Sequence, residues 1–139
     1  MLACSTIFTQ IMELLPWRRF QTCVRRYQGD YKVKTFNCAE HFRVMAFAQL
    51  TYRESLRDLT TCLQAVKPML YHMGIRSTVA KSTLADANCK RNWRIYADIA
   101  GIMIQRAKKL YSATPLPVDL DATAYALDST VIDLCMSMF

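Results

Sequence analysis

Apolar residues recur at helical spacing through most of the first 111 residues, and this pattern predicts a mainly α-helical body. Proline and glycine separate the apolar stripes and set approximate limits to the helices. The predicted helical segments are 6–15, which Pro16 ends, and then 37–50, 55–63, 68–73, 84–90 and 93–111.

Three of these helices carry an expected N-terminal cap, a Ser, Thr or Asn followed three residues later by an acidic residue. The three pairs are Asn37 and Glu40, Ser55 and Asp58, and Thr83 and Asp86. Asn92 is the expected cap of the last and longest helix. Gly74 follows the short segment 68–73 and is expected to end it in the left-handed conformation.

Spacing also predicts which side chains face the core. The stripes place the following residues inward: Ile7, Phe8, Ile11, Met12, Leu15, Phe42, Met45, Ala46, Leu50, Leu56, Leu59, Cys62, Leu63, Tyr96, Ile99, Ile102, Met103, Ala107 and Leu110. The stretch 17–27 alternates arginines with aromatic residues, a mixture that can grip phosphates and stack on bases. We favour the simpler interpretation, in which the aromatics are core and the arginines face solvent.

The pattern changes after Tyr111. Pro115 and Pro117 end the helical region, and segments 123–128 and 131–139 have the apolar alternation of strands. We therefore expect two parts, a helical domain over 1–111 and the start of a different, β-containing domain over 112–139, with the boundary near 112–120.

Charge divides the chain at almost the same place. The net charge is +7, but all 18 Lys and Arg residues lie at or before Lys109, together with seven acidic residues, so this part carries +11. The remainder has four aspartates and no basic residue. A basic body of this kind is typical of proteins that bind polyanions, although basic residues can also simply solvate helix faces.

Other site classes find little support. The six cysteines are scattered without a Cys-x-x-Cys pair, and the only histidines are His41 and His72, so no zinc motif is present. The isolated Gly29, Gly74 and Gly101 form no phosphate-binding loop. Neither a signal peptide nor a membrane-spanning run is recognisable, and we expect a cytoplasmic protein that does not enter a membrane.

The segments from Ser55 to Arg94 could form a loose helix-turn-helix. In that arrangement the second helix would present to a DNA groove Lys81, Ser82, Thr83, Asn88, Lys90 and Arg91, and the phosphate contacts would come from Arg53, Arg57 and Arg94. The link from Gly74 to Ser82 is longer than a usual turn, and a plain helical bundle fits the same pattern almost as well.

Asp128 ends an apolar stretch, Tyr125 to Asp128, where a strand would fix a carboxylate rigidly enough to hold a metal ion. A strand-end aspartate is more often a turn former. Spacing alone leaves both interpretations open.

Several long runs, in order, resemble the IS-four-like family of DDE transposases of bacterial insertion sequences. They are AQLTYRESLRDLTTCL (48–63), LYHMGIRSTVAKSTLADAN (70–88), NWRIYADIA (92–100) and YALDSTVIDLC (125–135). The resemblance implies a helical N-terminal domain followed by a ribonuclease-H-like α/β domain, of which 112–139 would supply the first β-hairpin. It also implies that Asp128 is the first of three catalytic carboxylates.

In such enzymes two Mg²⁺ ions, about 4 Å apart, promote cleavage and joining of DNA strands. The resemblance places the second Asp and the final Glu beyond Phe139, so we expect a truncated transposase that binds DNA without transferring strands and holds no Mg²⁺ stably. Expected partners are the ends of the insertion sequence and a second copy or a full-length transposase. The alternatives are a non-catalytic regulator of a full-length enzyme and an inert relic.

Overall fold

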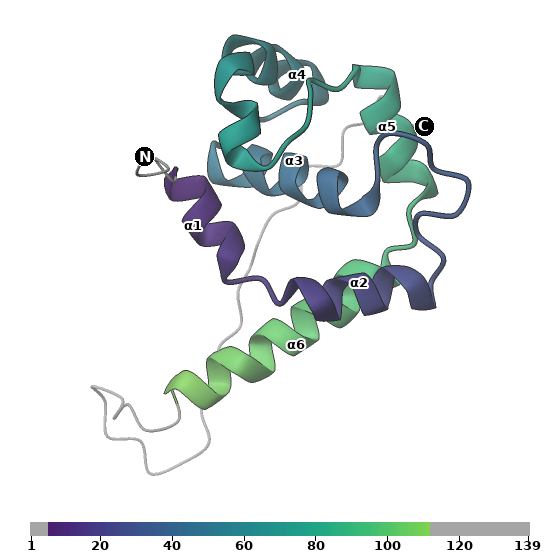
Figure 1. Cartoon of the computed structure of the whole chain (residues 1–139), viewed down its shortest axis with the longest axis vertical. Coiled ribbons are helices and arrows are strands. Elements are labelled where there is room, and N and C mark those ends of the chain that lie inside the picture. Colours follow the sequence, from purple (N-terminus) through teal and green to yellow (C-terminus); the bar gives the residue numbers. More distant parts are fainter. Residues whose placement is uncertain (1–5, 112–139) are drawn as a thin grey trace.

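A computed structural model describes residues 6–111, and within them the chain is helical without strands (Figure 1). Its elements are α1 (Ile7–Glu13), α2 (Trp17–Arg26), α3 (Cys38–Leu50), α4 (Leu56–Ala65), the 3₁₀ helix η1 (Lys67–Met73), α5 (Lys81–Lys90) and α6 (Arg94–Tyr111). The two strands expected at 123–128 and 131–139 lie outside the described residues, as does Asp128.

The predicted first helix is confirmed. Thr6 caps α1, since its hydroxyl accepts the backbone N–H of Thr9 at 3.2 Å. Its predicted inward stripe is wrong in part, because Ile7 and Ile11 are exposed whereas Met12 is buried. Pro16, expected only to end this helix, also directly precedes α2.

The arginine-rich stretch 17–27 forms a regular helix, α2. Phe20, Cys23 and Val24 are buried while the arginines point outward, which confirms that the apolar residues here are core. A turn around Gly29 then leads to α3.

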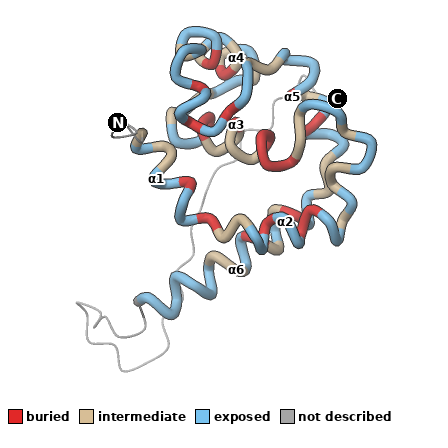
Figure 2. The backbone as a smooth tube through the Cα atoms, in the orientation of Figure 1, coloured by how far each residue is buried: buried red, intermediate tan, exposed pale blue. Residues whose placement is uncertain are grey.

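Helix α3 lies in the middle of the body, between two apolar clusters (Figures 1 and 2). Asn37 caps it as predicted, accepting the N–H of Glu40 at 2.8 Å. The predicted inward face is wrong in part, since Leu50 is exposed while Val44 and Phe47 are buried. The physical reason is that α3 is buried on two sides, so its apolar residues do not form one stripe from which the inward face could be predicted.

One cluster joins α3 to α4, η1 and α5, and its buried members are Val44, Phe47, Ala48, Leu59, Leu63, Leu70, Met73, Ile75 and Leu84. The Ser55 cap of α4 and the left-handed Gly74, with φ of 71°, are as predicted. Helix α5 begins at Lys81, so the predicted cap Thr83 is wrong: Thr83 lies inside the first turn. Leu84 and Ala87 are the buried residues of this helix.

The second cluster joins α2, α3 and α6, and its buried members are Leu15, Phe20, Cys23, Val24, Cys38, Ala39, Ile95 and Ile99. The side chain of Asn92 accepts the N–H of Arg94 at 3.1 Å, as expected for the start of α6. Ala107 and Leu110, predicted inward, are exposed. Figure 2 shows that the distal end of α6 has no buried residue, because that end extends beyond the two cores.

Candidate nucleic-acid interface

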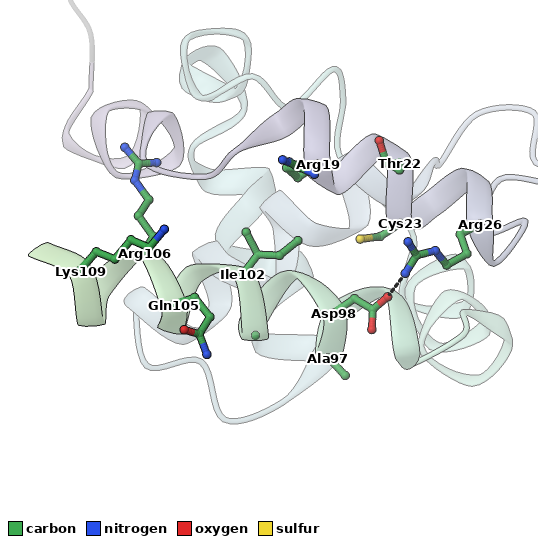
Figure 3. A pocket seen from close by; sticks show the side chains of 11 residues that line it. Arg19, Thr22, Cys23, Arg26, Ala97, Asp98, Ile102, Gln105, Arg106 and Lys109 are labelled. Atoms are coloured by element: carbon green, nitrogen blue, oxygen red, sulfur yellow. Dashed lines mark hydrogen bonds and ion pairs between the residues drawn. The ribbon is translucent and has the colours of Figure 1, made fainter.

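A groove of about 770 Å³ runs between α2 and α6 (Figure 3). Both helices turn their apolar faces toward the second core, where Phe20 and Val24 of α2 meet Ile95 and Ile99 of α6. The residues just beside that seam line the groove. They are Arg19, Thr22, Cys23, Arg26, Ala97, Asp98, Gly101, Ile102, Gln105, Arg106 and Lys109.

Cations of both helices line the groove. Arg19 and Arg26 are seven residues apart on α2, which places them on the same helix face. Arg106 and Lys109 lie one turn apart near the end of α6. Figure 3 shows them toward one end of the groove, with Arg26 toward the other. A basic ligand is therefore disfavoured and an extended anion is favoured.

These two helices concentrate the charge of the molecule. They carry eight of the 18 Lys and Arg residues and one acidic residue, Asp98. Together they therefore have a net charge of +7, while all other described residues contribute +4. Asp98 neutralises one cation, because its Oδ2 accepts hydrogen bonds from Arg26 Nη1 and from the Tyr27 hydroxyl, both at 2.9 Å.

The lining of the groove includes an exposed glycine in the middle of α6. A Cβ built on Gly101 meets no atom within 4 Å, so nothing in the described fold requires a glycine there. Glycine in a helix interior costs about 1 kcal/mol relative to alanine. A glycine that packing does not require leaves room for a ligand to approach the helix backbone.

The structure places the helix-turn-helix candidates in several different environments. Arg57 on α4 and Lys81, Ser82 and Thr83 at the start of α5 are exposed. Arg53 is half-buried, and its Nε donates to the Thr51 carbonyl at 3.0 Å.

Asn88, although exposed, and Arg91 both make side-chain hydrogen bonds to other segments of the fold. Asn88 Oδ1 lies 2.6 Å from Nε2 of His41, whose Nδ1 is 2.6 Å from the Tyr96 hydroxyl. This chain of hydrogen bonds joins α3, α5 and α6. Burial lowers the pKa of His41, and the charge of Arg91 lowers it further, against the hydrogen bond with Asn88.

The Arg91 side chain is buried and donates to the carbonyls of Gly29 and Phe36, with Asp30 3.6 Å away. Its charge therefore holds the loop after α2 against the end of α5. Of the two remaining candidates, Lys90 pairs with Asp86 at 2.8 Å, and Arg94 lies over the ring of the exposed Trp93.

The sequence pattern did not predict the groove. The arginines of 17–27 and the basic face of 93–111 are visible in the sequence, but no site was predicted at Arg19, Arg26, Arg106 or Lys109. Both signals were present, yet only the packing of α2 on α6 shows that the two basic faces line one groove.

Other site classes are not represented in the part of the chain that the structure describes. Residues 6–111 contain no cluster of three or more His, Cys, Asp or Glu side chains placed to hold a metal ion. None of the helices in that range is long and apolar enough to cross a membrane.

A protein-family model described as Domain of unknown function (DUF4372) matches residues 3–76. The match spans α1 to η1, including α2, and stops before α5 and α6. No curated protein and no solved structure matches the chain.

Proposed function

The chain belongs to the family described as Domain of unknown function (DUF4372), and from this premise we propose that its helical body binds double-stranded DNA through the α2–α6 groove. The observation that carries the proposal is the concentration of charge: the two packed helices have a net charge of +7, and four of their cations line one groove with a single carboxylate, Asp98. Phosphate contacts of Lys and Arg supply most of the affinity of non-specific DNA binding.

The dimensions suit a phosphate backbone. The groove-lining part of α6 runs from Ala97 to Lys109, which at the rise of an α-helix is about 18 Å. Phosphates of one strand follow each other at about 3.4 Å along the duplex axis, so the groove spans several of them. Arginine is the side chain best suited to hold them, because its planar guanidinium can donate two parallel hydrogen bonds.

The wider proposal is that this body is the DNA-binding part of a transposase of the IS-four-like DDE type, acting on insertion-sequence ends. It is supported by the ordered sequence runs within 48–100, which include most of α4 and α5 and the first turns of α6. Asp128 would then be the first catalytic carboxylate and a ligand of Mg²⁺. That residue lies outside the described range, and the substitutions that test DNA binding all lie in the helical body.

The test compares two double variants of the full chain that change the charge equally. Arg19→Gln with Arg106→Gln removes two groove cations, and Arg57→Gln with Lys81→Gln removes two exposed cations of the helix-turn-helix candidate. Binding to a fluorescent 20-base-pair duplex is followed by anisotropy across a salt series. The groove variant is expected to lose about tenfold to a hundredfold in affinity, about one order of magnitude or less for each phosphate contact.

The salt dependence gives a second, independent readout. If both arginines contact phosphates, the slope of log affinity against log salt falls by about two in the groove variant. The matched variant should retain the slope. Equal losses in the two variants would contradict a localised groove site. A larger loss of affinity in the matched variant would instead indicate that DNA binds at the surface of Arg57 and Lys81, on α4 and α5.

A further inference from the structure

The α2–α6 groove has two chemically different parts. Arg19, Arg26, Arg106 and Lys109 contribute cations to its lining, whereas Cys23, Ala97 and Ile102 contribute apolar side chains. A phosphate backbone uses only the cations. A ligand that uses both parts would combine acidic groups with apolar side chains.

The sequence contains one segment with that composition. Residues 112–139 have four aspartates and no Lys or Arg, in contrast to the +11 body that precedes them. Within them Leu116, Val118 and Leu120 alternate with Asp119 and Asp121. In an extended chain this alternation puts the apolar side chains on one face and the carboxylates on the other.

We propose that residues 112–139 bind in the α2–α6 groove of their own chain and compete there with DNA. The apolar residues would contact the apolar side chains of the groove, and the aspartates would pair with its cations. The competition with DNA rests on the proposed function, whereas the binding of the segment does not.

The segment is long enough to reach. From Asp98 to Lys109 the groove extends along α6 for about 17 Å. Asp119 is eight residues beyond Tyr111, the last residue of α6, and an extended chain of that length spans about 26 Å. This reach exceeds the length of the groove along α6, so the segment is long enough to turn back at the end of α6 and follow the groove.

Because the segment is covalently attached to the helical body, it can occupy the groove even if its intrinsic affinity is weak. A short flexible link gives an effective concentration of about 1 mM. A segment that alone binds with a dissociation constant of about 0.1 to 0.5 mM would then weaken DNA binding by about three- to tenfold. A second copy of the chain would need comparable protein concentrations to act in this way.

The experiment uses the full chain and first leaves DNA out. Nitrogen-15 NMR follows the side-chain Nε–Hε signals of Arg19 and Arg106, with Arg57 on α4 as a remote reference. Val118→Ser with Leu120→Ser alters the segment at unchanged charge. Both groove signals are expected to move in this variant while that of Arg57 stays in place.

A second pair of variants separates local contact from overall charge. Asp119→Asn with Asp121→Asn should move the same two signals, and Glu54→Gln with Asp86→Asn, which changes the charge equally outside the groove, should not. Anisotropy with the 20-base-pair duplex should then show about three- to tenfold tighter binding for both segment variants.

The possible results distinguish the binding of the segment from the proposed binding of DNA. Groove signals that stay in place in the Val118 and Leu120 variant overturn the inference. Shifts that depend on protein concentration also overturn it, in favour of a second copy as the occupant. Shifts at constant concentration in a chain that binds no duplex would support the segment and refute the proposed DNA binding.

Discussion

Replacing Gly101 by alanine should make the fold more stable and DNA binding weaker. Gly101 lies in the interior of α6 and lines the groove, and an added methyl group would meet no atom within 4 Å. The substitution therefore removes backbone freedom from the unfolded chain without a steric cost in the folded one.

The size of the stability gain follows from these facts. Alanine is favoured over glycine in a helix interior by about 1 kcal/mol. For a helical body of this size, that corresponds to a rise of about 4–8 °C in the midpoint of thermal unfolding. The methyl group also occupies space that a phosphate or sugar would need, and we expect a loss of about three- to tenfold in affinity for the 20-base-pair duplex.

Thermal unfolding followed by circular dichroism measures the first effect, and fluorescence anisotropy measures the second. Ala100→Gly is the matched control, since Ala100 is an exposed neighbour on the same helix that does not line the groove. It should lower the midpoint by a similar amount and leave affinity unchanged. A Gly101→Ala variant no more stable than the parent would contradict the free space around this position, and a more stable variant with unchanged affinity would refute close approach of DNA to Gly101.

Three further predictions concern the interior. Gly29→Ala should lower the free energy of unfolding by about 1–3 kcal/mol in urea denaturation, because its Cβ would lie 2.5 Å from Ile95 Cδ1; an unchanged midpoint would contradict this packing. Arg91→Lys should cost about 2–3 kcal/mol in the same assay, since an ammonium group cannot reproduce the guanidinium bonds to the carbonyls of Gly29 and Phe36; full stability with reduced DNA binding would instead make it a DNA contact. His41 has a lowered pKa in the folded chain, so its contribution to stability is present above about pH 6.5 and is lost as the pH falls, by at most about 1.4 kcal/mol per pH unit. In His41→Gln the urea midpoint should therefore change less between pH 7.5 and pH 5.5 than in the parent. An equally steep dependence of the midpoint on pH would exclude this histidine as the cause.

The sequence was most informative where one residue determines a local conformation. The caps at Asn37 and Ser55 and the left-handed Gly74 are such cases, and all three are confirmed. The Thr83 cap is wrong because burial of Leu84 set the start of α5, although the local motif pointed elsewhere.

Inward faces were predicted less well, because they depend on packing partners that no local pattern reveals. Leu110 has helical spacing relative to Ile99 and Ile102 but lies where α6 extends past its neighbours, and it is exposed. Ile95, fully buried, was not predicted, because the partners that bury it come from helices distant in the sequence. The candidate site was missed for the same reason, since its cations come from segments more than seventy residues apart.

The fates of the arginines show why charge in a sequence does not locate a binding surface. Arg91 and Arg19 are equally basic in the sequence, yet they have opposite environments. The Arg91 side chain is buried and donates to backbone carbonyls, so its substitution is expected to lower the stability of the fold. Arg19 is exposed beside a groove that holds further cations. Asp98 is the one carboxylate that lines this groove, so its cations outnumber its anions, and a polyanion or an acidic segment would balance that excess. The α2–α6 face is therefore the first place where a ligand of this protein should be sought.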